Sequence, residues 1–214
     1  MAGTSRDLIR RLLEGHGQTF AEELGVKMRP ASPSALFRLL CFALLASARI
    51  RHEQAFSATR ALTESGWSTP KAMAAASWEQ RVKVLNTHGY ARYDDEKTSR
   101  FLADTSTLLL EKYGGDLRRL REAAKRDPTR ERELLRECKG IGDVGVDIFF
   151  REAQVIWNEL YPFADPRALR AARKLGLPAD AESLARHAPQ MQFARLIAAL
   201  VRVKLAKAYA KVRG

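Results

Sequence analysis

The chain has 214 residues and a mass of 24.0 kDa, which suits one large domain or two small ones with a core that needs no disulfides. Apolar residues make up 46% and charged residues 29%, a balance that excludes disorder of the whole chain. Lysine and arginine outnumber acidic residues by 37 to 25. The net charge of +12 favours a polyanionic partner, either nucleic acid or an anionic membrane surface, over a basic protein without one.

The membrane alternative is disfavoured by the longest apolar run. That run covers residues 39–48 between Arg38 and Arg49, well short of the roughly 20 residues of a transmembrane helix. The amino-terminal residues lack the apolar segment of a signal peptide, so we expect a cytoplasmic protein, associated with the nucleoid if it is bacterial. Cys41 and Cys138 are far apart in the chain, and we expect buried thiols with no disulfide framework and no metal site.

Four predicted helices begin with a small polar residue followed by proline at the first helical position. These dipeptides are Ser32-Pro33, Thr69-Pro70, Asp127-Pro128 and Asp165-Pro166. A capping box from Ser77 to Gln80 and an Asp116 cap predict two further helix starts. Apolar residues between these starts recur at spacings of three and four, and no segment shows the alternation of a strand. The sequence therefore predicts an all-α fold.

The carboxy-terminal segment carries a large share of the positive charge. Residues 183–214 contain seven lysines and arginines and no acidic residue. Residues 191–209 also contain apolar side chains at helical spacing, from Phe193 to Leu205. We therefore expect a packed helix with a basic outer face rather than a fully solvated one.

Residues 134–150 are predicted to form the end of one helix, a tight turn and the start of another. In the turn, Gly140 and Gly142 flank the apolar Ile141. Glycine allows a sharp turn and lets the amides at the start of the next helix approach a phosphate with no Cβ in the way. By itself this pattern favours a phosphate site and a plain connection between helices about equally.

The sequence around the hairpin separates these two readings. The hairpin is followed by Tyr-Pro-Phe-Ala-Asp-Pro-Arg at residues 161–167 and by Lys-Leu-Gly-Leu at residues 174–177. Upstream lie Leu-Leu-Ala-Ser-Ala at residues 44–48 and Thr-His-Gly-Tyr at residues 87–90. Across residues 33–180 the chain resembles the helix-hairpin-helix DNA glycosylase superfamily, the endonuclease III-like proteins.

The resemblance implies two helical lobes: an inner bundle of residues 33–136, and a second lobe of residues 1–32 and 137–214, with the helix-hairpin-helix motif at residues 131–150. It implies a monomer that binds double-stranded DNA, flips out a damaged or mispaired base and hydrolyses its glycosidic bond in base excision repair. Weakly stacked bases are the natural substrates because flipping then costs less. Which base is excised does not follow from the sequence.

Two departures from the family pattern limit the expected chemistry. Bifunctional members carry a lysine two positions after the second glycine of the hairpin, where this chain has Val144. Valine has no amine to form a Schiff base, so we expect a monofunctional enzyme that uses water and has little or no lyase activity. Many relatives also end in a four-cysteine motif, which this chain lacks after Cys138; we expect no iron–sulfur cluster and no other cofactor.

The resemblance makes Asp165 the candidate catalytic residue. The first free amides of the helix that begins at Pro166 can bind its carboxylate, and the helix dipole favours the ionised form. A fixed carboxylate could stabilise the cationic sugar that develops as the glycosidic bond breaks, and could orient water. The alternative is a plain helix cap; in that case asparagine would serve about equally well and leave folding nearly unchanged.

The sequence also contains candidates for contacts with DNA and with a flipped base. The DNA-binding candidates are Lys139, Gly140, Ile141, Gly142, Val144 and Gly145 of the hairpin, and Arg49, Arg51 and His52 after the helix of residues 36–46. Val144 and Asp147, one helical turn apart, are candidates for the base pocket, although Asp147 could equally be solvated. Tyr90, Arg92 and Tyr93 combine aromatic rings with charge, which suits base stacking or the core.

Two other functions stay open on the sequence alone. One is a non-catalytic DNA-binding protein that keeps the hairpin for phosphate contact, because the missing lysine is compatible with it. The other is a helical module that recognises an acidic protein, since positive charge does not by itself select nucleic acid. Retention of an acid at Asp165 favours the enzyme.

Overall fold

The computed structural model describes residues 2–48, 50–90 and 95–213. All regular structure in these ranges is helical, which confirms the all-α prediction. The α-helices are α1 (Ala2–His16), α2 (Phe20–Glu23), α3 (Pro33–Ser47), α4 (His52–Glu64), α5 (Pro70–Ala75), α6 (Trp78–Leu85), α7 (Asp95–Tyr113), α8 (Leu117–Ala123), α9 (Pro128–Arg136), α10 (Asp143–Ala153), α11 (Pro166–Leu175), α12 (Ala181–Ala185), α13 (Gln190–Leu205) and α14 (Tyr209–Arg213). A π-helical turn, η1 (Asn86–Tyr90), and a 3-10 turn, η2 (Asn158–Leu160), complete the elements.

The predicted helix starts are confirmed by their caps. The four polar residues that precede proline all accept backbone N–H groups of the first turn: Ser32, Thr69, Asp127 and Asp165. Ser77 and Gln80 form the reciprocal capping box, and Asp116 caps α8. These local hydrogen bonds satisfy amides that have no partner within the helix.

The chain divides into two compact units. Residues 24–149 form one unit, here called the central unit, and residues 1–23 with 150–214 form the other, the terminal unit. Helix α10 runs from the central unit into the terminal unit, because its residues 143–149 belong to the first and its residues 150–153 to the second. The predicted division has the same order of segments but places the boundaries at 33 and 136.

Packing explains where the boundaries lie. The segment before α3 belongs to the central unit because Val26 is buried and Arg38 of α3 donates to the Leu24 carbonyl oxygen at 2.8 Å. At the other boundary, a Cβ on Gly145 would lie 3.7 Å from the Ala43 carbonyl oxygen, so the start of α10 packs closely on α3. The hairpin is therefore part of the central unit.

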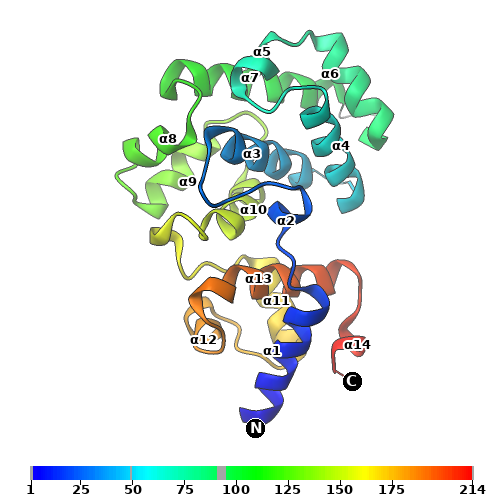
Figure 1. Cartoon of the computed structure of the whole chain (residues 1–214), viewed down its shortest axis with the longest axis vertical. Helices are drawn as coiled ribbons and strands as arrows, with labels where there is room; N and C mark the ends of the chain where they lie inside the picture. The colour runs from blue at the N-terminus through cyan, green and yellow to red at the C-terminus, as the bar shows by residue number, and fades with distance from the viewer. Residues whose placement is uncertain (1, 49, 91–94, 214) are drawn as a thin grey trace. The chain divides into compact units, whose positions relative to one another are not determined.

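Helix α3 supplies the core of the central unit. Ten of its residues are buried, and the other helices of this unit surround it (Figure 1). Helices α4 and α8 pack against it directly. A helix that is apolar on nearly all sides must be covered on all sides, which explains why residues 39–48 are so rich in leucine without crossing a membrane.

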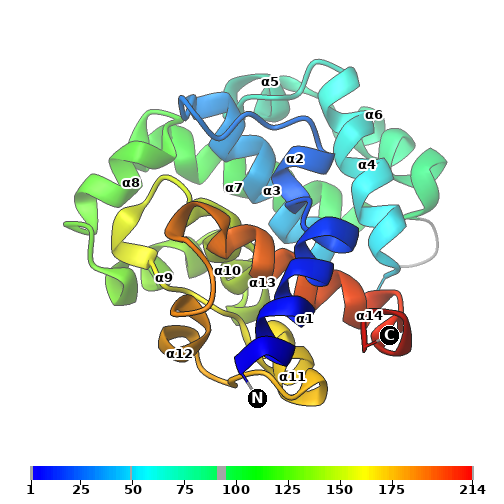
Figure 2. The same ribbon diagram turned by 60° about the horizontal axis from the view of Figure 1, so that its bottom comes forward.

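Helix α13 supplies the core of the terminal unit. It packs against α1 and α11, and Figure 2 shows these three helices together. Its buried side chains include Phe193, Leu196, Ile197 and Leu200, while Lys204 is half-buried and Lys207, after the helix, is exposed. The prediction of a packed carboxy-terminal helix is therefore confirmed, whereas two of the cations on its outer face, Arg195 and Arg202, are paired with Glu22 and Glu23.

Candidate functional site

The hairpin presents an exposed turn anchored by one buried side chain. Helix α9 ends at Arg136 and α10 begins at Asp143. Between them Ile141 is buried, whereas Lys139, Gly140 and Gly142 are exposed. An apolar anchor with exposed backbone on both sides leaves the amides at the start of α10 accessible to an anion.

The two glycines of the turn have different roles. Gly140 has a φ of +85°, and a Cβ there would lie 2.5 Å from Cδ2 of Phe101 on α7. Gly140 is therefore needed for the turn conformation and for close packing. A Cβ on Gly142 would meet no heavy atom within 4 Å. The open space beside Gly142 is where a phosphate could approach.

An acidic residue at the hairpin was not singled out by sequence reasoning. Asp143 is exposed at the first position of α10, and its carboxylate lies 3.5 Å from the Arg136 guanidinium and 3.9 Å from that of Arg132. An acid in the first turn stabilises a helix, and this residue could have been identified on that basis. Its negative charge opposes a phosphate at the same helix start, and Arg136 partly balances it.

Val144 and Asp147, the two pocket candidates, have different environments. Val144 is 41% exposed, which is unusual for a large apolar residue and leaves it available to a ligand. The Asp147 carboxylate accepts a hydrogen bond from Arg132 Nη2 at 2.7 Å. Because Arg132 lies on α9, this ion pair braces the two helices of the hairpin against each other.

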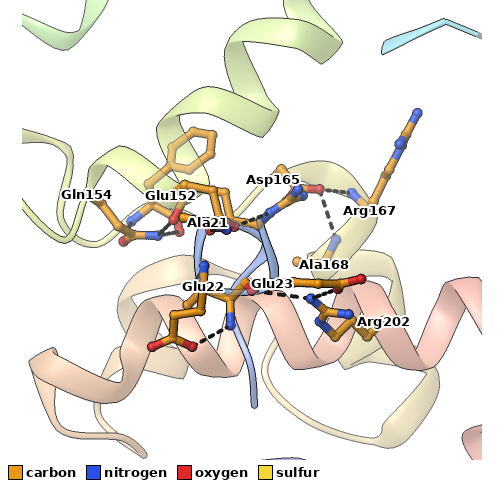
Figure 3. A network of polar contacts seen from close by, with 12 residues as sticks. Ala21, Glu22, Glu23, Glu152, Gln154, Asp165, Arg167, Ala168 and Arg202 are labelled. Carbon is orange, nitrogen blue, oxygen red and sulfur yellow. Dashed lines mark hydrogen bonds and ion pairs between the residues drawn. The ribbon is translucent and has the colours of Figure 1, made fainter. Parts of the chain in front are cut away.

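Asp165 is a fixed carboxylate in the terminal unit. Its Oδ1 accepts the backbone N–H groups of Arg167 at 2.8 Å and Ala168 at 3.2 Å, at the start of α11 (Figure 3). The residue is only 2% exposed. The predicted cap is therefore present, and the carboxylate has little freedom to rotate.

A buried arginine also binds Asp165. Arg151 of α10 donates from Nη1 to Asp165 Oδ2 at 3.0 Å, and Arg151 is itself 2% exposed. Its guanidinium stacks over the Phe20 ring at 4.5 Å from the centroid. Sequence reasoning missed Arg151; the only signal was the charged pair Arg151-Glu152 directly after the apolar residues 148–150.

Glu152 shares the guanidinium of Arg151 with Asp165. Its Oε1 lies 3.4 Å from Arg151 Nε, and its Oε2 accepts the backbone N–H of Ala21 at 2.9 Å (Figure 3). Burial raises the pKa of the Glu152 carboxyl above its ordinary value, against the opposing effect of Arg151. Burial therefore favours the neutral form of the Glu152 carboxyl.

The loop that carries Asp165 is held by Gln154. The Gln154 Nε2 donates to the carbonyl oxygens of Arg151 and Phe163, each at 3.0 Å, and its Oε1 accepts the Phe163 N–H at 3.1 Å. The Phe163 ring also packs edge-on against Phe150. Gln154, directly after α10, thus holds the loop, and Arg151 of α10 holds the carboxylate that follows it.

The remaining candidates contribute less to a defined site. Arg51 precedes α4 and is exposed, with its backbone N–H bound by the Gln54 side chain, and His52 Nδ1 lies 3.4 Å from Glu53. Arg49, Arg92 and Tyr93 lie outside the described residues, as does the side chain of Tyr90.

The cysteines do not form a metal site. Cys41 and Cys138 are both buried free thiols, as predicted, and burial raises the pKa of each, that of Cys138 to about 12. A four-cysteine cluster cannot be assembled from two cysteines. Among the described residues there is also no group of three or more histidine, cysteine, aspartate or glutamate side chains arranged to hold a metal ion.

The described helices also include none that is long and apolar enough to cross a membrane. This finding agrees with the short apolar run seen in the sequence.

No family model matches the sequence, and no curated protein matches it. Two solved structures of endonuclease III do match the fold. The first, a trapped covalent intermediate with DNA, has a TM-score of 0.51 and 18% identity over 86% of this chain and 82% of that one. The second, a non-covalent complex with DNA, has a TM-score of 0.50 and 17% identity over 86% and 81%. The chain therefore has the helix-hairpin-helix fold of endonuclease III.

Proposed function

We propose that this protein binds double-stranded DNA and excises a damaged or mispaired base as a monofunctional DNA glycosylase. Two observations support DNA binding: the fold, and the exposed hairpin turn with open space beside Gly142. The net charge of +12 provides the long-range attraction that such binding needs. The two endonuclease III structures contain DNA, and we propose the same class of partner for this chain.

The observation that carries the catalytic part is the fixed carboxylate of Asp165. Two backbone amides and Arg151 hold it in a single orientation. A carboxylate that is already oriented stabilises developing positive charge on the sugar without reorganising during the reaction. The same group can orient the attacking water, while protein contacts exclude bulk solvent.

The monofunctional part depends on Val144. In bifunctional members of the family the corresponding lysine attacks the sugar, forms a Schiff base and leads to strand cleavage. Val144 is exposed but has no nucleophile. The proposed product is therefore a free base and an intact strand with an abasic site.

The test is a screen of duplex oligonucleotides that each contain one lesion or mismatch. The protein in excess is incubated with each duplex, and the products are separated with and without alkali. The proposal predicts strand breaks that depend on alkali for at least one substrate. Breaks without alkali on any substrate would instead show lyase activity and contradict the monofunctional assignment.

A second candidate function is supported by the Arg151 contact. Because Arg151 pairs with Asp165 at 3.0 Å and Asp165 is 2% exposed, the charge available to a sugar cation is reduced. The chain would then be a DNA-binding protein without glycosylase chemistry. A gel shift on the same duplexes separates the two functions: binding without excision on any lesion favours the second.

A further inference from the structure

Helix α2 contacts the buried arginine that binds Asp165. Phe20, the first residue of α2, is 2% exposed, and the Arg151 guanidinium lies over its ring at 4.5 Å from the centroid. The guanidinium of Arg202 on α13 lies over the same ring at 4.4 Å. The face of an aromatic ring carries partial negative charge, so Phe20 attracts both cations. The amino-terminal part of the chain therefore supplies a contact to the group that orients Asp165.

Polar contacts hold the backbone of α2 at the same place. The Ala21 N–H donates to Glu152 Oε2 at 2.9 Å (Figure 3). On the other side, Arg202 Nε donates to the Gln18 carbonyl oxygen at 2.8 Å. Residues 18–23 are thus attached to α10 and to α13, and the aromatic ring that they carry has little freedom to move.

The ring restricts Arg151 in a way that the carboxylates do not. Asp165 Oδ2 accepts a hydrogen bond from Nη1 at 3.0 Å, and Glu152 Oε1 lies 3.4 Å from Nε. Because two carboxyl groups compete for one guanidinium, a small displacement strengthens one contact and weakens the other. The attraction of the ring falls as the cation moves away from its centre, so Phe20 opposes such a displacement.

We propose that Phe20 is a positioning residue for base excision: its ring holds the Arg151 guanidinium where it orients the Asp165 carboxylate. This inference rests on the proposed function. Without the ring, the guanidinium can move toward Glu152 and leave Asp165 Oδ2 without its charged partner. Phe20 acts through Arg151 and not on the substrate. A catalytic group displaced by about 1 Å loses about 100-fold in rate, so even a partial loss of orientation is measurable.

The first test replaces Phe20 by leucine, which keeps an apolar side chain and removes the aromatic face. The substrate is a lesion duplex from the excision screen, in a single turnover. The Phe20→Leu variant should release the base about 10-fold more slowly than the native protein. Its affinity for the duplex in a gel shift should be unchanged, because the ring affects the orientation of Asp165 and not the binding of DNA.

The control is Leu12→Ala, which removes a fully buried side chain from α1 of the same unit. It should lower the melting temperature at least as much as Phe20→Leu, because truncation to alanine leaves a cavity. Below both melting temperatures, its rate of base release should match that of the native protein. Equal losses of rate in the two variants would show an effect of stability alone and would overturn the proposal.

A second test keeps the shape of the ring and changes its charge distribution. Phe20 is replaced by phenylalanine analogues with one, two or three ring fluorines, each of which reduces the negative charge of the ring face. The rate of base release should fall with each added fluorine and approach that of the Phe20→Leu variant. A ring that only fills space predicts one rate across the series, and that result would overturn the proposal.

NMR of the Arg151 Nε–H group follows the guanidinium directly, and the Arg151→Lys variant identifies the signal because it lacks it. The order parameter of this group should decrease in Phe20→Leu and stay at the native value in Leu12→Ala. An unchanged order parameter in Phe20→Leu would overturn the proposal. No base release by the native protein from any lesion would instead refute the proposed function, while the NMR measurement still shows whether Phe20 holds Arg151. The two failures are therefore distinguishable.

Discussion

Replacing Asp165 by asparagine tests the Arg151 contact through stability. As a cap, asparagine is nearly as good as aspartate, so a simple cap predicts almost no change. Arg151 alters this expectation, because its guanidinium is buried and donates to Asp165 at 3.0 Å. Removing one partner of a buried ion pair typically costs about 3–5 kcal/mol. In the Asp165→Asn variant the Glu152 carboxyl still lies 3.4 Å from Arg151 Nε and partly balances its charge. We therefore expect a loss of stability at the lower end of this range, about 3 kcal/mol.

The assay is urea unfolding followed by circular dichroism, for the native protein and the Asp165→Asn variant. A loss of about 3 kcal/mol corresponds to a melting temperature lower by about 6–12 °C for a chain of this size. The triple variant Arg151→Met, Glu152→Gln and Asp165→Asn removes all three charged groups and should recover at least half of the loss. A loss below about 1 kcal/mol in the single variant would show that Asp165 acts only as a cap and would refute this reasoning.

Three further predictions concern the hairpin and the buried acid. Gly140→Ala should destabilise the fold, by about 1–2 kcal/mol for the left-handed backbone and by about 1–3 kcal/mol for overlap with Phe101. Gly142→Ala should instead keep the native stability in urea and weaken DNA binding in a gel shift. Borohydride should trap no adduct with native protein; trapping equal to that of Val144→Lys would contradict the assignment. As the pH rises above 4.5, the native protein should lose stability relative to the Glu152→Gln variant. Burial raises the pKa of the Glu152 carboxyl in the folded state, so its ionisation favours unfolding. Melting temperatures that change equally with pH in the two proteins would contradict this.

Local features were predictable from the sequence and distant contacts were not. A cap such as Asp127 forms within a few residues, so the dipeptide with Pro128 is sufficient to predict it. The partner of Asp165 could not be predicted, because Arg151 reaches it only once α10 and the following loop are folded. An arginine that follows an apolar run does not show which acid it will bind.

The hairpin shows the same limit in another form. The two glycines were predicted together as residues that let a phosphate approach, but an added Cβ would meet the Phe101 ring at Gly140 and open space at Gly142. Gly140 is required because Phe101, from a helix far earlier in the chain, packs against it. Asp147 likewise could not be assigned to a pocket or to solvent until its ion pair with Arg132 was seen.

The central claim is that Asp165 supports excision of a base by water. The most direct measurement is the single-turnover rate of base release from a lesion duplex, at saturating protein and at a temperature where circular dichroism shows both proteins folded. The native protein should release the base and leave a strand that breaks only in alkali. The Asp165→Asn variant should bind the duplex. It should release the base at least about 100-fold more slowly than the native protein, because its neutral amide cannot stabilise the sugar cation. Equal rates in the two proteins, or no release by the native protein from any lesion while binding persists, would contradict the claim.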